Sequence, residues 1–191
     1  MPDDPPSKRA ILSAAFKLFV RAGFDSTNIR EIAKEAGYSN PALFKFFDSK
    51  EHLGLYLFER SYLKYAAVFE SAMKAGRPFE ENLDETVERF CEILKENPGS
   101  FLFVQDHLRH FWPSVDSRVR KTSILGQIRQ LIEQGISEHT VGTDVDPKML
   151  VAAFVGFLTQ YARMHYFGEF KGGVDAWKNQ LKTVSRRLLV G

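Results

Sequence analysis

The sequence contains little of what marks a secreted or membrane-spanning protein. A single cysteine, Cys91, excludes an internal disulfide framework, and it is most simply a small buried apolar residue, with a redox role as the alternative. The longest apolar run, 149–158, is about half as long as a membrane span. The N-terminal residues MPDDPPS lack the basic and apolar regions of a secretion signal. These absences predict a cytoplasmic protein.

An excess of charge of one sign is also missing. The 26 Lys and Arg residues nearly balance the 24 Asp and Glu residues, so the net charge of +2 does not by itself indicate a nucleic-acid partner. Any basic surface must therefore be local. Apolar residues make up 44% of the 191 positions, which is enough for a real hydrophobic core and excludes a disordered chain.

Catalytic and metal-binding motifs are absent from the sequence as well. There is no nucleophile motif, no glycine loop that cradles phosphate, and no paired Glu-x-x-His motif. His107 and His110 are three residues apart, but no third ligand is fixed beside them, so we predict no metal. We predict neither an enzyme nor a cofactor. An all-helical enzyme with a spatially assembled site and a helical adaptor that binds another protein are the alternatives.

Helical periodicity between Gly and Pro breaks is what the sequence does contain, with no credible strand alternation. Residues 8–22 form an amphipathic pattern that ends at Gly23, and further helices are predicted near 49–75, 80–96, 99–111, 114–138, 146–168 and 173–189. The fold class is therefore all-α. We predict an N-terminal three-helix domain at residues 5–65 and a larger C-terminal helical domain at residues 66–191, with the boundary inside a helix.

Residues 29–47 have the pattern of a DNA-reading helix-turn-helix. Gly37 separates two short helices, because glycine adopts positive φ without steric cost and lets the chain turn sharply. Asn28 and Glu31 have the spacing of a capping box before the first helix. The second helix is predicted from Pro41 to about residue 46, with Ser39 or Asn40 as its cap; Pro41 favours Asn40. The apolar anchors are Ile29, Ile32, Ala33 and Ala36 in the first helix and Leu43, Phe46 and Phe47 in the second.

This segment and its flanks resemble the tetracycline-repressor (TetR) family of bacterial transcription regulators. The matching positions are Ile11-Leu12, Ala14-Ala15, Leu18-Phe19, Gly23, Thr27, Ile32-Ala33, Ala36-Gly37, Ser39, Leu43, Phe47, Ser49-Lys50-Glu51 and Leu53. The resemblance implies a regulator that binds double-stranded operator DNA. The predicted DNA-binding residues are Thr27, Asn28, Arg30, Ser39, Asn40, Pro41, Ala42, Phe44, Lys45 and Lys50.

Four of these positions depart from the family pattern. The family often has Gly at Pro41, Thr at Ala42, Tyr at Phe44 and His at Lys45 or the residue after it. Phe44 lacks the hydroxyl with which Tyr would donate to a phosphate, whereas Lys45 could supply a charged replacement.

The middle of the chain concentrates aromatic bulk with a few polar groups, which is the usual lining of a pocket for a partly apolar molecule. Aromatic residues at helical spacing are also typical of an ordinary core, so the pocket is implied chiefly by the family resemblance. The predicted pocket residues are Phe90, Phe101, Val104, His107, Phe111, Trp112, Tyr161 and His165.

The last two predicted helices carry apolar seams suited to bundle packing. Inward packing explains such seams equally, but a second face of small residues near 152–162 favours a partner. The resemblance implies a homodimer through these helices, with an interface of Phe154, Phe157, Tyr161, Trp177, Leu181 and Val184. We therefore predict a dimeric repressor that a small-molecule effector releases from its operator, although the sequence does not exclude an activator.

Overall fold

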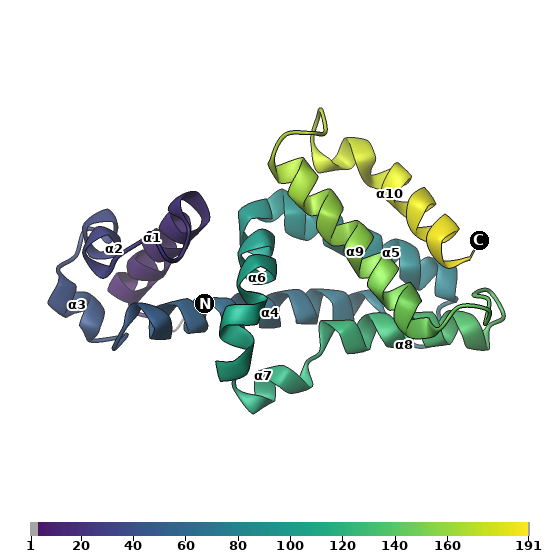
Figure 1. The fold of residues 1–191 in the computed structure, drawn as a ribbon, viewed down its shortest axis with the longest axis horizontal. Coiled ribbons are helices and arrows are strands. Elements are labelled where there is room, and N and C mark those ends of the chain that lie inside the picture. The colour runs from purple at the N-terminus through teal and green to yellow at the C-terminus, as the bar shows by residue number, and fades with distance from the viewer. Residues whose placement is uncertain (1–3, 191) are drawn as a thin grey trace. The chain divides into compact units, whose positions relative to one another are not determined.

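The computed structural model describes residues 4–190, and every regular element in that range is helical (Figure 1). The elements are α1 (Pro6–Ala22), α2 (Ile29–Ala36), α3 (Asn40–Phe44), α4 (Lys50–Ala72), α5 (Phe79–Glu96), α6 (Pro98–Phe111), η1 (Trp112–Ser114), α7 (Ser117–Lys121), α8 (Ile124–Ser137), α9 (Pro147–Tyr166) and α10 (Val174–Leu189). The predicted all-α fold is confirmed. None of the helices in this range is both long and apolar enough to cross a membrane.

The helices form two compact units. The first unit comprises the chain up to Ser61 together with Phe103–Asp116, and the second comprises Tyr62–Leu102 and the chain from Ser117 onward. Two helices, α4 and α6, therefore each contribute one part to one unit and the rest to the other. The division into domains at residues 65 and 66 stays a prediction.

The first unit is built around α1, which packs against α2 and α3. Of the apolar face that the sequence pattern predicts for α1, Ile11, Ala15, Leu18 and Phe19 are buried and Ala22 is exposed; Gly23 ends the helix with φ 87°. The side chains of Ile32, Leu43 and Phe47 are at most 1% exposed, so α2, α3 and the loop before α4 contribute to one core. Burial of this apolar stripe, more than helix propensity, stabilises helices as short as α2 and α3.

Aromatic rings bring the C-terminal part of α6 into the same core. The ring of Phe103 stacks on that of Phe19 with centroids 6.0 Å apart, and the ring of Phe111 meets Phe24 edge-on at 5.2 Å. Gly54 on α4 permits this approach. A Cβ atom there would lie 2.5 Å from Phe24 and 2.7 Å from Phe111, so any larger residue would displace the rings.

In the second unit, α5 packs against α8 and α10, and α9 packs against the same two helices. Figure 1 shows α9 and α10 as an adjacent pair, coloured green and yellow. Ion pairs tie α10 to α5: Lys182 pairs with Glu88, Arg186 with Asp84 at 2.7 Å, and Lys95 with Asp175. Helix α10 is thus held to α5 by ion pairs as well as by its buried apolar residues, among them Leu181 and Leu189.

The single helix predicted at 114–138 is wrong, because the structure divides this segment into η1, α7 and α8. Val115 is extended, with φ −63° and ψ 136°, and ends η1. Thr122 donates its hydroxyl to the carbonyl of Val119 at 2.7 Å, and the Ser123 hydroxyl accepts from the Gly126 N–H at 3.1 Å. These two side chains offer the backbone hydrogen bonds that compete with a continuous helix, a local effect that apolar periodicity does not report.

Candidate functional site

The turn between α2 and α3 has the predicted helix-turn-helix geometry. The Asn28 side chain accepts from the Glu31 N–H at 3.0 Å, while the Glu31 carboxylate accepts from the Asn28 N–H at 3.1 Å, so the predicted capping box is confirmed. Gly37 is left-handed, with φ 75° and ψ 25°. The Tyr38 N–H donates to the Ala33 carbonyl at 2.9 Å and closes the end of α2. The chain can therefore enter α3 within a few residues.

Of the two predicted caps of α3, the structure has Ser39 and not the favoured Asn40. Ser39 is the N-cap, with an extended backbone and no hydrogen bond from its side chain, and Asn40 is already helical. Asn40 was favoured as the cap because Pro41 disfavours helical geometry in the residue before it. The early start satisfies the backbone instead, since the Ala42 N–H donates to the Ser39 carbonyl at 3.0 Å.

The outward side of α3 carries several of the predicted DNA-binding residues. Pro41, Phe44 and Lys45 are exposed, whereas Asn40 and Ala42 are half-buried. Arg30 on α2 and Ser39 are exposed as well. This surface offers amide, hydroxyl, apolar and cationic groups together, which suits contact with both bases and phosphates.

Two other residues of the predicted DNA-binding set face the protein. Thr27 is 2% exposed, and its hydroxyl donates to the Gly23 carbonyl at 2.8 Å. The Lys50 ammonium donates to the carbonyls of Phe24 and Asp25 at 3.0 and 3.3 Å. It also lies 4.5 Å from the centroid of the Phe24 ring. These hydrogen bonds tie the loop after α1 to the start of α4 and occupy two of the three N–H donors of the ammonium, so a contact of Lys50 with a phosphate stays a prediction.

The Phe24 ring is the centre of a cluster of aromatic and cationic side chains that the sequence patterns do not predict. Besides Lys50 and Phe111, it contacts the rings of His107 and His110 at centroid distances of 5.9 and 5.4 Å. Phe24 lies in a loop, outside any helical pattern, so periodicity gave no signal for it. Its contacts join the loop after α1 to the last turns of α6.

The predicted ligand-pocket residues fall into both units. Val104, His107, Phe111 and Trp112 belong to the first unit, where Val104 and Phe111 are buried. His107 Nδ1 lies 2.9 Å from the Phe103 carbonyl, which can only accept, so this nitrogen carries the proton. Phe90, Phe101, Tyr161 and His165 belong to the second unit.

The aromatic rings of the four predicted pocket residues of the second unit contact one another, and two of their polar atoms have no hydrogen-bond partner. The ring of Phe90 meets that of Phe101 at 5.4 Å and that of Tyr161 at 6.4 Å, and Tyr161 stacks on His165 at 5.8 Å. The Tyr161 hydroxyl and His165 Nδ1 are buried and make no hydrogen bond within the protein. Burial raises the pKa of Tyr161 to about 12, so this hydroxyl stays protonated and can donate. Cys91 is buried, and burial raises the pKa of its thiol to about 11, so it stays a neutral thiol.

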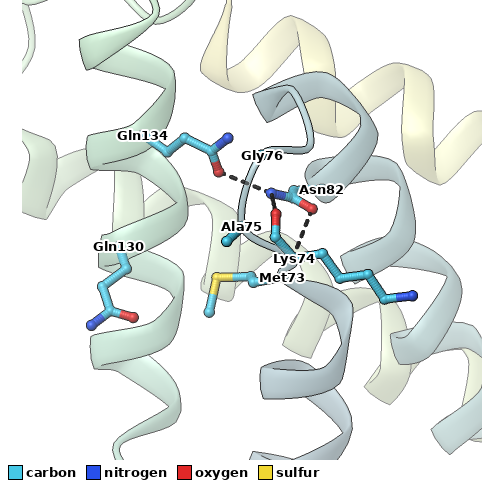
Figure 2. Close-up of a pocket in the computed structure, with 7 residues that line it drawn as sticks. All are labelled: Met73, Lys74, Ala75, Gly76, Asn82, Gln130 and Gln134. Carbon is cyan, nitrogen blue, oxygen red and sulfur yellow. Dashed lines mark hydrogen bonds between the residues drawn. The ribbon is translucent and has the colours of Figure 1, made fainter.

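A different part of the second unit contains an open depression of about 340 Å³ (Figure 2). Asn82 and Gln134 line it, and Figure 2 shows the Asn82 amide between Gln134 and the backbone of Lys74. Asn82 Nδ2 donates to Gln134 Oε1 at 3.0 Å, and Asn82 Oδ1 accepts from the Lys74 N–H at 3.2 Å. These bonds satisfy the buried amide within the protein. The Asn82 side chain therefore holds the loop after α4 against α5 and α8.

The residues of the predicted dimer interface differ in exposure. Within the single chain Phe154, Tyr161 and Leu181 are at most 5% exposed, Phe157 and Trp177 are half-buried, and Val184 is 41% exposed. The exposed residues of α9 include the small Ala152, Ala153 and Gly156 beside the larger Lys148, Met149, Gln160, Met164 and Tyr166. The interface itself stays a prediction.

Residues 11–57 match the model of the family described as "Bacterial regulatory proteins, tetR family". The chain is 24% identical over 164 residues to the uncharacterized HTH-type transcriptional regulator YhgD of Bacillus subtilis. The aligned region covers 83% of this chain and 85% of YhgD.

Two solved structures share the fold over nearly the whole chain. One is a tetR-family regulatory protein from Rhodococcus RHA1, at a TM-score of 0.83 and 18% identity, covering 97% of this chain and 98% of that protein. The other is the transcriptional regulator FadR of Bacillus subtilis in complex with stearoyl-CoA, at a TM-score of 0.76 and 17% identity, covering 96% and 98%. At these identities the likeness establishes the fold.

Proposed function

We propose that this chain is a homodimeric repressor that a small-molecule ligand releases from its operator. The chain belongs to the tetR family of bacterial regulatory proteins and is a DNA-binding transcriptional regulator. The observation that carries the DNA-binding part is the presentation of α3. Leu43 and Phe47 fix the segment in the core, while Pro41, Phe44 and Lys45 remain exposed beside the turn at residue 37. The recognition helix of a helix-turn-helix presents its base-contacting side chains in this way.

DNA binding is tested by the salt dependence of affinity for a duplex selected from a random library. Lys45→Ala should weaken binding to all duplexes and reduce the slope of log affinity against log salt by about one unit per lost phosphate contact. Lys121→Ala is the matched control, because Lys121 is an exposed lysine in the second unit. Equal slopes for wild type and Lys45→Ala would contradict the assignment of Lys45.

The ring cluster around Tyr161 supports a ligand with an apolar body and an oxygen acceptor. Because the buried Tyr161 hydroxyl makes no hydrogen bond within the protein, a bound acceptor would restore the bond that burial removed. The stearoyl-CoA in the FadR structure makes an acyl thioester the first class to test.

Stearoyl-CoA should therefore lower the affinity of the wild type for the selected duplex. Tyr161→Phe should respond several-fold more weakly while its DNA affinity without ligand is unchanged. DNA binding that stearoyl-CoA leaves untouched would exclude this effector class.

A dimer is supported by the small exposed side chains of α9 and by the geometry of operators. Twofold dimers place two recognition helices in successive major grooves, about 34 Å apart. A Cβ atom at Gly156 would meet no other atom within 4 Å, so Gly156→Arg tests the exposed side of α9 without disturbing the chain's own packing. In sedimentation, Gly156→Arg should be monomeric where the wild type and an exposed control, Ser137→Arg, are dimeric. A dimeric Gly156→Arg would place the interface elsewhere.

The effect of ligand binding in the second unit can be transmitted to the DNA-binding unit through helices that belong to both. Both α4 and α6 contribute residues to each unit, so a shift of either helix in the second unit moves part of the first. The free energy by which the ligand weakens DNA binding then equals the difference between its binding free energies for the DNA-binding and the released conformations.

A further inference from the structure

Phe44 at the end of α3 is the most exposed large apolar side chain of the first unit among the residues that the structure describes. The exposed large apolar side chains in this part of the unit are Tyr38 at 39%, Phe44 at 49% and Leu108 at 37% exposure. By contrast, Phe19 and Phe58 of the same unit are at most 2% exposed. Exposure of Phe44 is therefore a local arrangement and does not reflect a core too small to hold it.

The backbone of α3 determines the direction of Phe44. Leu43, the preceding residue, is fully buried, and Phe47, three residues later, is 1% exposed. Pro41 lies three residues before Phe44, so the two side chains share one side of the short helix. Both are exposed, and exposed Lys45 follows them. An apolar strip with a cation at its end thus lies on the surface that we propose to face DNA.

We propose that Phe44 is a specificity-determining residue that recognises thymine by packing its ring against the C5-methyl group in the major groove. This inference rests on the proposed DNA-binding role of α3. Thymine is the base that presents an apolar group in that groove, while the other base edges present hydrogen-bond donors and acceptors. A phenylalanine ring has no group that could bond to those edges or to a phosphate, so the methyl group is its chemical match.

Lys45 complements this contact with charge. An apolar contact contributes little to attraction over distance, whereas an ammonium beside it can bind the backbone phosphate and hold the register of the helix on the duplex. Phe44 then discriminates between bases and Lys45 contributes affinity that is independent of sequence. The two neighbouring residues have separable effects, which makes the assignment testable.

The test uses duplexes selected by the purified wild-type chain from a random library. Each thymine of the preferred duplex is replaced in turn by deoxyuridine, which removes the methyl group and keeps base pairing. At one thymine of each half-site, deoxyuridine should weaken wild-type binding about fourfold, the equivalent of one methyl group left unburied. Phe44→Ala should bind the thymine duplex about as weakly as the wild type binds the deoxyuridine duplex. The change from thymine to deoxyuridine should then lower the affinity of Phe44→Ala less than 1.5-fold further.

Two further variants separate this effect from structural damage. Leu108→Ala removes an exposed apolar side chain of the same unit outside α3 and should keep the full fourfold deoxyuridine effect. Phe44→Leu keeps an apolar side chain and should retain part of the preference for thymine. Because Phe44 and Leu108 are both exposed, all three variants should keep the helix content and melting temperature of the wild type.

The possible outcomes are distinct. If every deoxyuridine duplex binds the wild type as tightly as its thymine parent, or if Phe44→Ala retains the fourfold effect, Phe44 does not read thymine. Loss of dimerisation in Phe44→Ala, with an unchanged deoxyuridine effect, would instead assign the ring to contact between copies of the chain. If the wild type selects no duplex at all, the proposed DNA-binding function fails, and this inference fails with it.

Discussion

The two units differ in the buried polar atoms that they leave without a hydrogen-bond partner. In the first unit, the buried Thr27 hydroxyl donates to a backbone carbonyl and the half-buried Lys50 donates to two. The second unit also satisfies its buried Asn82 and Thr86 side chains with hydrogen bonds. Polar atoms of Tyr161, His165 and Ser185 in the second unit, however, are buried without a hydrogen-bond partner. Every such buried atom among residues 4–190 belongs to the second unit.

This difference fits the partners that we propose for each unit. A unit that binds DNA on its outer surface can satisfy all of its interior, because its partner contacts exposed residues such as Lys45. A unit that takes a ligand among its helices keeps interior donors and acceptors available, at a cost in stability that a bound ligand offsets. The following predictions test this contrast, beginning with the largest expected effect.

Phe24→Ala should lower the free energy of unfolding of the first unit by about 3–5 kcal/mol, because it removes the ring that Lys50, His107, His110 and Phe111 contact. Urea denaturation followed by circular dichroism measures this. Phe44→Ala is the control, since its ring is exposed. A loss below about 1 kcal/mol would show that the cluster relaxes around the cavity and is not a structural centre of the unit.

Thr27→Val should lower the free energy of unfolding by about 1 kcal/mol, because a buried hydroxyl that donates to the Gly23 carbonyl at 2.8 Å is lost. The same urea titration reports it. Exposed Thr183 on α10 provides a control as Thr183→Val. A neutral Thr27→Val would mean that the first unit gains nothing from satisfying this group.

Ser185→Ala should raise the free energy of unfolding by about 0.5–1 kcal/mol. Ser185 is fully buried and its hydroxyl has no partner, and alanine is also the better helix former inside α10. The sign opposes that of Thr27→Val, although both variants remove one buried hydroxyl. Destabilisation by Ser185→Ala in a thermal melt would remove the contrast between the units.

Acid should weaken the attachment of α10 to α5, with an effect below about 1 kcal/mol because water screens these partly exposed ion pairs. The hydrogen bond from Lys182 holds the pKa of the Glu88 carboxyl below its ordinary value of 4.5. A lowered folded-state pKa contributes stability that is present above pH 4.5 and is lost as the pH falls below it. Unfolding titrations at pH 6 and pH 4 should therefore show a smaller loss for Glu88→Gln than for the wild type.

The control for this pH effect is Glu81→Gln, which changes an exposed carboxyl of the same helix. It should lose as much stability on acidification as the wild type. An equal pH dependence of all three proteins would assign the acid sensitivity to other groups.

Local rules account for the parts of the fold that were predictable from the sequence. The capping box of Asn28 and Glu31 and the left-handed Gly37 depend on residues within one turn of each other, so their pattern is readable along the chain. The break at Thr122 and Ser123 and the cap at Ser39 are local too. Apolar periodicity does not predict the break, because it does not report competing hydrogen bonds between side chain and backbone. Ser39 is one of the two predicted caps, although the proline rule favours Asn40.

The sequence by itself determined the all-helical class, the helix-turn-helix and the resemblance to the tetR family over residues 11–57, since each depends on residues close together in the chain. Only the tertiary structure decided that Lys50 binds the carbonyls of Phe24 and Asp25, and that the end of α6 belongs to the N-terminal unit. It also decided which polar atoms of the second unit stay unpaired. These are contacts between residues far apart in sequence, and their partners become defined only when the helices pack.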